Sequence, residues 1–387
     1  MKPESRVNYL KKIGSFSCKK VVWLDKANQQ KIKIIANAQD CMTYGPKDVR
    51  ERQEKAHVRS PIIFLYEFEN ACVTSRSSSI ISGDTVYIER IKHIGNDIAD
   101  YKAGFIIGHD TERAIIDTTI DFEIDCAIFL GGNGSWNYYH WMIEILPKLY
   151  YYEKIGILRD GVTILVPEEA KKIDSFNKML KEALNGYNVN LIYMKSGSVY
   201  KVGSLKTVTT ANNVVFNCRR LIFDINFCFF RKDALEYTKK NAIQSIPFNY
   251  KFNKSKICKK IFLARKESSN RNYNQKEIQI VLQNFGFKTI FMEDLTLQEQ
   301  IIAFMQAEFI IGPSGAAWTN IIFCRPGTKA LSWLPEKIKN FSVFSSLAVY
   351  SKVNMYFFFC KSYSNYLHGR YYVSPKELKN LINFLDR

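Results

Sequence analysis

The segment NYYHWMIEILP, from Asn137 to Pro147, places one histidine and one carboxylate among aromatic and aliphatic residues. On a helix, Asn137, His140 and Glu144 share one face at spacings i, i+3 and i+7. Imidazole and carboxylate groups are the usual acceptors of a proton from a hydroxyl at neutral pH. The pattern therefore predicts a helix that presents a general base, and a buried histidine with a purely structural role is the alternative.

Apolar residues are expected to pack this helix against a core. Trp136, Tyr139, Ile143 and Leu146 form the apolar stripe beside the polar one. No second histidine lies at metal-ligand spacing, so a zinc site is not expected. The only echo of a metal-binding D-x-D pattern is DFEID, residues 121–125, which we interpret as a solvated strand edge. The sequence predicts neither a bound metal nor a cofactor.

Anion-binding groups are concentrated much later in the chain. In FIIGPSGAAWTNIIFCRPGT, residues 309–328, a buried strand is followed by small residues and then a helix. Backbone amides at Ser314, Gly315 and Ala316, together with the positive helix end, can approach a phosphate closely. The segment lacks the lysine of a phosphate-binding P-loop and is not G-x-G-x-x-G. A tight turn that packs a helix on a sheet is the alternative interpretation.

An arginine-containing loop follows another strand, in IFLARKESSNRNYNQKEI. The strand carries Arg265 and Lys266 at its carboxyl end, and Arg271 follows six residues after Arg265. Guanidinium groups can hold a diphosphate bidentately and neutralise a leaving group. Asn274, with Glu277 three positions on, predicts a capped helix. A solvated surface loop is the alternative.

The elements that would position these residues follow two rhythms. Residues 60–130 read as short strands and turns, and from Trp136 onward helices alternate with strands. The polar stretch from Asn241 to Lys260 is the best linker candidate. After it, five strands separated by helices predict a doubly wound parallel sheet, which binds ligands at the carboxyl ends of its strands.

Composition narrows the classes of function. With 387 residues, 47% of them hydrophobic, the chain is long enough for two folded domains and the cleft between them. No apolar run is long enough to span a membrane and no secretory signal is evident, so a cytoplasmic location is expected. Nine scattered cysteines suit free thiols. The net charge of +18 indicates an anionic partner or reflects the base composition of the source genome.

The three chemistry-bearing segments, in this order, resemble glycosyltransferase family 61. NYYHWMIEILPKL is similar to its N-[YF]-x-H-W-x-x-E/D-x-L-P-x-L segment, LARKESSNRNYNQKEI to its arginine loop, and GPSGAAWTNIIFCRPGT to its G-P-x-G-A-x-x-T-N segment. The resemblance runs from roughly Leu130 to Pro335. Where family members usually carry histidine between the proline and the glycine, this chain has Ser314, so its donor site is expected to differ in detail.

The resemblance implies a GT-B-like α/β fold: two Rossmann-like lobes with a deep cleft between them, here with an extra β-rich amino-terminal region. Residues 1–243 would form the acceptor-side lobe and residues 244–370 the lobe that binds the nucleotide sugar. The helix within 371–387 could pack back on the first lobe. The roles implied are a catalytic base at Glu144 or His140, acceptor contacts at Asn137 and Trp141, and donor contacts at Arg265, Lys266, Arg271, Ser314, Gly315, Ala316 and Asn320.

The function implied is metal-independent, inverting transfer of a sugar from a nucleotide-diphosphate sugar, UDP-linked by preference. The acceptor would be a hydroxyl of a growing cell-surface glycan or lipid-linked glycan, as in capsule or lipopolysaccharide synthesis. The excess positive charge suits peripheral contact with an anionic inner membrane face. The alternatives are another glycan-modifying transferase, such as a pyruvyl transferase, and a nucleic-acid-binding protein. The basic residues are dispersed and no recognition motif appears, which disfavours nucleic acid as a partner.

Overall fold

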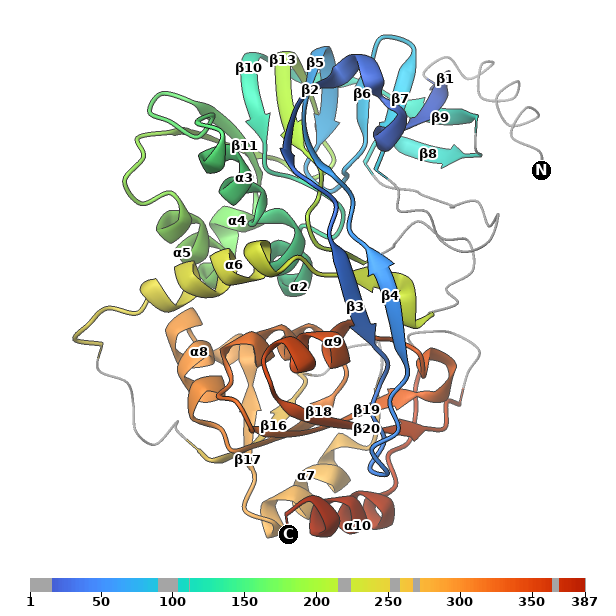
Figure 1. Ribbon diagram of the computed structural model, residues 1–387, viewed down its shortest axis with the longest axis vertical. Coiled ribbons are helices and arrows are strands. Elements are labelled where there is room, and N and C mark those ends of the chain that lie inside the picture. Colours follow the sequence, from blue (N-terminus) through green and yellow to red (C-terminus); the bar gives the residue numbers. More distant parts are fainter. Residues whose placement is uncertain are drawn as a thin grey trace. The chain divides into compact units, whose positions relative to one another are not determined.

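The structure is a computed structural model, which describes residues 16–89, 104–110, 112–214, 224–250, 258–266, 272–363 and 369–386. These residues divide into two compact units, and both mix helices with strands (Figure 1). Unit 1 contains the described residues within 16–41, 59–214 and 229–241. Unit 2 contains those within 42–58, 224–228 and 242–386.

Unit 1 is built on an eleven-stranded sheet in the order β12-β11-β10-β13-β5-β6-β7-β1-β9-β8, with β2 paired to β5. Its first four strands in this order run parallel to one another. They are β10 (Ile120–Phe129), β11 (Thr163–Pro167), β12 (Asn190–Met194) and β13 (Val199–Val208). The remainder is mainly antiparallel and comprises β1 (Phe16–Trp23), β2 (Lys31–Ala36), β5 (Ile63–Thr74), β6 (Ile80–Ser82), β7 (Thr85–Ile88), β8 (Ile106–His109) and β9 (Arg113–Asp117). The strand-rich region predicted for residues 60–130 is confirmed.

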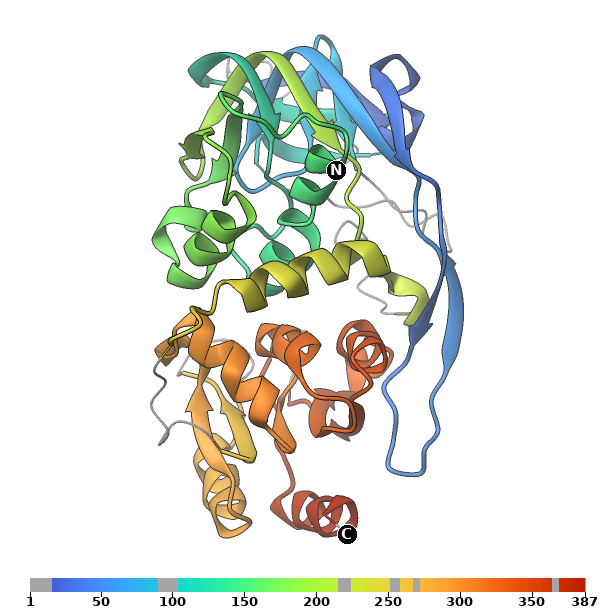
Figure 2. The same cartoon turned by 60° about the vertical axis from the view of Figure 1, so that its left-hand side comes forward.

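Helices of unit 1 follow the parallel strands. After β10 come α2 (Tyr138–His140), the π-helical turn η3 (Trp141–Ile145) and α3 (Lys148–Lys154). Two short helices follow β11, α4 (Glu169–Lys172) and α5 (Asp174–Ala183), and they are separate because Ile173 between them has an extended backbone. A further helix, α6 (Lys232–Gln244), includes the start of the expected linker and crosses beneath the green helices in Figure 2, where it is yellow.

Unit 2 contains the five parallel strands that the sequence predicts. Their order is β17-β16-β18-β19-β20, so the first two in the chain exchange places in the sheet. The strands are β16 (Lys260–Ala264), β17 (Lys288–Phe291), β18 (Phe309–Pro313), β19 (Lys329–Pro335) and β20 (Asn354–Cys360). Parallel strands buried on both faces read as continuous apolar runs, which is why the sequence identifies them.

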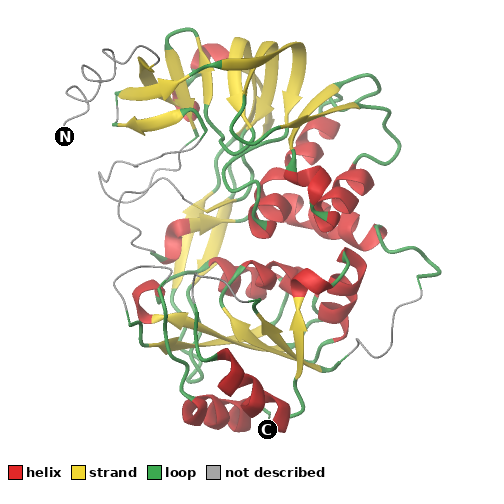
Figure 3. Cartoon of the chain, turned by 180° about the vertical axis from the view of Figure 1, so that it is seen from behind, coloured by secondary structure: helices red, strands yellow, loops and turns green. Residues whose placement is uncertain are grey.

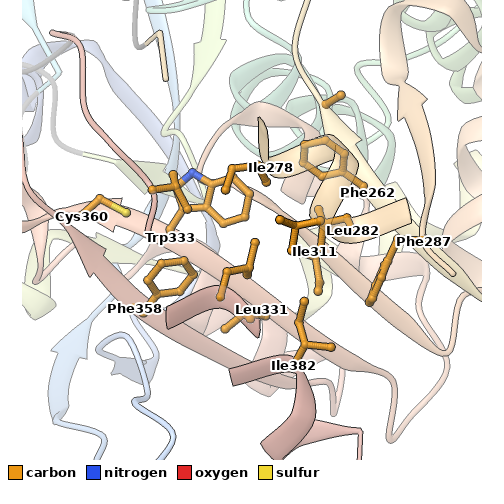
Figure 4. Packing of buried hydrophobic residues seen from close by; sticks show 14 of the residues in the cluster. Phe262, Ile278, Leu282, Phe287, Ile311, Leu331, Trp333, Phe358, Cys360 and Ile382 are labelled. Carbon is orange, nitrogen blue, oxygen red and sulfur yellow. The ribbon is translucent and has the colours of Figure 1, made fainter. Parts of the chain in front are cut away.

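Helices cover both faces of this sheet (Figures 1 and 3). On one face α7 (Gln275–Asn284) and α10 (Pro375–Leu385) bury apolar side chains against alternate strand residues such as Phe262 and Leu331 (Figure 4). On the other face lie α8 (Leu297–Gln306), the 3₁₀ helix η7 (Ala316–Phe323) and α9 (Val343–Tyr350). The carboxyl-terminal helix α10 thus belongs to the core of unit 2, through Leu378, Ile382 and Leu385.

An amino-terminal hairpin also joins unit 2, although the sequence places all of residues 1–243 in the first lobe. The hairpin pairs β3 (Asp40–Tyr44) with β4 (Lys55–Arg59). The Tyr44 amide donates to Ser346 Oγ at 2.9 Å, and the Tyr44 carbonyl accepts from Ser345 Oγ at 2.6 Å. These partners lie about three hundred residues away in the chain, beyond the reach of any local sequence pattern.

Within the described ranges, no helix has both the length and the apolar character needed to cross a membrane. The eight cysteines in those ranges are all free thiols.

Candidate active site

The helix that carries His140 and Glu144 contains a π-helical turn. Leu146 N–H donates to the Trp141 carbonyl five residues back, at 2.9 Å, instead of four residues back as in an α-helix. Pro147 follows and has no N–H to donate. Single π-turns within helices occur frequently at functional sites. The turn also rotates the residues that follow it relative to those that precede it.

The π-turn leaves the Met142 carbonyl, and Pro147 leaves the Ile143 carbonyl, without its usual helical donor, and side chains from other segments of unit 1 replace those donors. Thr238 Oγ1, on α6, donates to the Met142 carbonyl at 3.0 Å. Asn212 Nδ2 donates to the Ile143 carbonyl at 2.9 Å. An unsatisfied buried carbonyl costs about 1 to 3 kcal/mol, so these two bonds stabilise the irregular geometry.

His140 and Glu144 form a buried, hydrogen-bonded pair across this turn. Their Nδ1 and Oε2 atoms are 2.7 Å apart, and the two residues are 7% and 4% exposed. Gly134, at φ +71°, lies against the imidazole: a Cβ at this position would come within 2.6 Å of His140 Cγ. Tyr139 meets the imidazole edge-on. The pair is held in one geometry, and only a small edge of each side chain reaches solvent.

A buried lysine lies one turn beyond the pair. Lys148 is 3% exposed, and its Nζ donates to the Gly131 carbonyl at 2.9 Å, which ties α3 to the glycine-rich loop before α2. Burial lowers the pKa of Lys148, and the negative charges of Glu89 and Glu144 oppose this effect. Lys148 therefore places a cationic side chain in the electrostatic environment of Glu144.

The residues expected to contact the acceptor have other roles. Asn137 caps α2, because its Oδ1 accepts from the Tyr139 amide at 2.9 Å. Trp141 is fully buried and stacks on Phe176 with ring centroids 5.2 Å apart, so its ring is not available to an acceptor. Trp136, expected in the core, is instead 50% exposed. It precedes the cap and lies before the π-turn, so it does not share the buried face of the later residues.

In unit 2 the structure brings Arg265 to the turn after β18. Strands β16 and β18 are parallel neighbours, so their carboxyl ends lie at the same edge of the sheet. Arg265 Nη2 donates to the Ser314 carbonyl there. The guanidinium occupies the space beside Gly315, where a Cβ would come within 2.7 Å of Nη2. Glycine at this position is therefore what permits Arg265 to lie against the turn.

The helix that follows the turn is 3₁₀ and not α. Trp318 N–H bonds to the Gly315 carbonyl at 3.0 Å, so the amides of Ala316 and Ala317 precede the first intrahelical bond. Such amides, beside a guanidinium, suit an anion. Asn320, expected to contact the donor, is fully buried, and its Nδ2 donates to the Ala317 carbonyl at 3.2 Å. Its side chain supports the helix from within.

The rest of the arginine loop is arranged differently from the prediction. Lys266 points to solvent in an ion pair with Asp294, with Nζ and Oδ1 2.5 Å apart. This hydrogen bond raises the pKa of Lys266. Asn274 precedes α7 without capping it: its side chain exchanges two hydrogen bonds with the backbone of Val373, at 2.9 and 3.0 Å. Arg271 lies outside the described residues.

Gln275 is a residue that the sequence analysis missed. Its Oε1 accepts from the Arg265 amide at 2.8 Å, and its Nε2 donates to the Arg265 carbonyl at 2.7 Å. Tyr273 OH donates to the same Oε1 at 2.8 Å. The first helical residue of α7 thus clamps the backbone of Arg265. No pattern distinguishes such a glutamine, and the same holds for Asn212 and Thr238.

No group of three histidine, cysteine or acidic side chains able to hold a metal ion is present in the part of the chain that the structure describes. In DFEID, Asp121 and Asp125 are exposed on the first half of β10, and Asp121 Oδ2 accepts from the Val199 amide at 2.8 Å. This matches the interpretation of a solvated strand edge.

Comparison with known families identifies the chain. Residues 138–331, about half of its length, match the family model described as Glycosyltransferase 61. The chain belongs to glycosyltransferase family 61. The comparison with curated proteins found no match. The matched range of this transferase includes the His140–Glu144 pair. It also includes Arg265 and the Ser314–Ala316 turn.

Proposed function

We propose that this family 61 enzyme transfers a sugar from a nucleotide-diphosphate sugar, UDP-linked by preference, to a hydroxyl of a growing cell-surface polysaccharide or glycolipid. The acceptor oxygen attacks the anomeric carbon as the bond to the diphosphate breaks, with the bonding electrons leaving on the diphosphate. A single displacement of this kind inverts the configuration at that carbon. The observation that carries the proposal is Arg265 held beside the amides of Gly315 and Ala316 at the carboxyl edge of a parallel sheet.

The donor side relies on positive groups without a metal. The Arg265 guanidinium and the amides at the start of η7 stabilise the departing diphosphate, and Arg271 adds a second guanidinium. Preorganised donors at a developing negative charge contribute several kcal/mol, roughly 10² to 10³ in rate for a single donor. Ser314 replaces the histidine that the family usually carries, so Arg265 supplies a larger share of the charge here.

The acceptor side relies on the His140–Glu144 pair. The proton of the attacking hydroxyl passes to Glu144, with His140 orienting the carboxylate at 2.7 Å. In the exchanged arrangement His140 takes the proton and Glu144 stabilises the imidazolium, as in other histidine–carboxylate pairs. In a GT-B arrangement, the His140–Glu144 pair would act on the acceptor while Arg265 and the turn after β18 act on the donor of the same reaction. Contact with an anionic inner membrane, where lipid-linked acceptors lie, is part of the proposal.

Donor binding tests the proposal first. Thermal-shift measurements on the full chain would compare UDP-, GDP- and CMP-linked sugars with phosphoenolpyruvate and duplex DNA. A nucleotide sugar at about 100 times its Kd stabilises the folded state by about 2.7 kcal/mol. Stabilisation by a UDP-sugar, followed by inverted glycoside product with a glycan acceptor, supports the proposal. Stabilisation only by phosphoenolpyruvate or by DNA would replace it with a pyruvyl transferase or a nucleic-acid-binding protein.

A further inference from the structure

Trp136 is a large aromatic side chain that unit 1 leaves half exposed. Its relative exposure is 50%, whereas Trp141, Trp318 and Trp333 are fully buried. Trp136 directly precedes Asn137, the cap of α2. It follows two residues after Gly134, and Gly134 lies against His140. Trp136 thus presents an exposed indole a few residues before the His140–Glu144 pair in the chain.

A second loop is fastened beside Trp136. Ser135 Oγ donates to the Ser75 carbonyl at 2.9 Å. Asn133 and Ser78 exchange two bonds: the Ser78 amide donates to Asn133 Oδ1 at 3.0 Å, and the Asn133 amide donates to Ser78 Oγ at 3.1 Å. These bonds flank Arg76 on one loop and directly precede Trp136 on the other. The loops that carry the two side chains are therefore held together by side chain–backbone hydrogen bonds.

Arg76 is oriented by a carboxylate. Its guanidinium lies 5.2 Å from the Trp136 ring centroid. Its Nε and Nη2 both donate to Glu169 Oε1, at 3.0 and 2.5 Å. The Arg76 side chain is 45% exposed, whereas that of Glu169 is 9% exposed. Glu169 Oε2 is buried and has no hydrogen-bond partner among the described residues.

This arrangement has the chemistry of a sugar subsite. A sugar hydroxyl accepts hydrogen bonds, so the half-exposed guanidinium of Arg76, held in place by Glu169, can donate to it. The electron-rich face of an indole attracts the weakly positive C–H groups of a pyranose ring. The Arg76–Glu169 ion pair has no net charge, so it suits a neutral sugar better than an acidic one.

We infer that Trp136, Arg76 and Glu169 form a subsite for a neutral pyranose of the acceptor glycan, which stacks on Trp136 and presents its hydroxyl toward His140 and Glu144. The inference rests on the proposed function, because it assigns the acceptor to this pair. It adds a binding platform whose Arg76 and Trp136 lie outside the matched family range, and it replaces the acceptor contacts expected of the buried Trp141.

Binding is tested on the full chain without any donor. The probes are methyl glycosides of glucose, galactose, mannose, N-acetylglucosamine and glucuronic acid, and the readout is iodide quenching of tryptophan fluorescence. We expect at least one neutral glycoside to protect the wild-type fluorescence saturably and the glucuronide not to. Trp136→Phe should abolish this protection signal, whereas Trp23→Phe, which alters a partly buried tryptophan on β1, should preserve it. Absence of protection by every glycoside overturns the inference, as does protection by the glucuronide alone.

Transfer kinetics give the second readout. With the donor found by thermal shift, Trp136→Ala should raise the acceptor KM by roughly 10-fold to 100-fold, the loss expected for a buried aromatic anchor. The donor KM should be unchanged, and Trp136→Phe should recover most of the loss. Equal acceptor KM values in wild type and Trp136→Ala would overturn the subsite while leaving the transferase intact. Lack of transfer by the wild type with every donor would instead count against the proposed function.

Discussion

Gly134→Ala tests whether the glycine-rich loop holds the His140 imidazole in its hydrogen bond with Glu144. An alanine at φ +71° carries the strain of the left-handed region, about 1 to 2 kcal/mol. Its Cβ would also come within 2.6 Å of His140 Cγ, and overpacking of this kind costs about 1 to 3 kcal/mol. The two effects together predict a loss of about 2 to 5 kcal/mol in the free energy of unfolding of unit 1.

The chain offers a matched control for the backbone strain. Gly156 has nearly the same φ, +72°, and lies in the same unit, but a Cβ there would meet nothing within 4 Å. Gly156→Ala should therefore lose only the strain, about 1 to 2 kcal/mol. The difference between the two variants isolates the contact with the imidazole.

Urea unfolding followed by circular dichroism measures the two stabilities, and a transfer assay measures activity. We expect Gly134→Ala to be the less stable variant and to lose activity, because the imidazole must move away from Glu144. Gly156→Ala should retain normal activity. Equal stability and full activity in both variants would refute the argument that Gly134 fixes the pair.

Three further predictions concern Lys148 and the arginine loop. Burial lowers the pKa of Lys148 in the folded protein below 10.5. Between that lowered pKa and pH 10.5 the unfolded state therefore binds more protons than the folded state. The unfolding free energy of the wild type should thus rise with pH relative to Lys148→Met, by up to about 1.4 kcal/mol per pH unit, in paired denaturation curves. Gln275→Ala removes two bonds to Arg265, so calorimetry should show donor affinity weakened while unfolding loses about 2 kcal/mol. Arg265→Lys should raise the donor KM at least about 10-fold in transfer assays, because lysine lacks the bidentate fork. In contrast, Lys266→Ala, which breaks an exposed ion pair with Asp294, should change the donor KM by less than about twofold.

The sheet of unit 2 was predictable because its strands are buried on both faces and its helices fall between them. Runs such as FIIGP and KALSWLP are continuous and apolar, so the strands and the distances between them can be recognised in the sequence. The proximity of Arg265 to Ser314 followed from the same reasoning, since parallel neighbours end at one edge. These inferences needed only local pattern and the rule for parallel sheets.

The hairpin and the two tryptophans were not predictable in this way. The bond from Tyr44 to Ser346 joins segments about three hundred residues apart, and no local pattern encodes it. The helical stripe placed Trp136 in the core and the family resemblance implied an acceptor contact at Trp141, but Trp136 is half exposed and Trp141 is fully buried. Helical phase fails here because Trp136 precedes the cap and the π-turn adds one residue to the turn that follows. Sequence periodicity assumes 3.6 residues per turn throughout.

Buried polar contacts are a second kind of feature that could not be predicted from the sequence. Thr238 satisfies a carbonyl that the π-turn exposes, and Asn212 satisfies one that Pro147 leaves without its donor, but no local pattern identifies either partner. Nothing in the sequence distinguishes Lys148 from a surface lysine, and only the structure shows that its ammonium is buried on the Gly131 carbonyl. Such residues are found only once the path of the backbone is known.

Single-turnover transfer by Glu144→Gln is the most direct test of the central claim that the His140–Glu144 pair accepts the proton of the acceptor hydroxyl. The substitution keeps the shape of the side chain and removes its basic oxygen. Glu153→Gln, an exposed carboxylate on the adjoining helix α3, is the matched control. We expect the transfer rate of Glu144→Gln to fall by roughly 10² to 10⁴ with donor affinity unchanged, while Glu153→Gln remains normal. A rate within about twofold of the wild type, in this variant and in His140→Ala alike, would contradict the account.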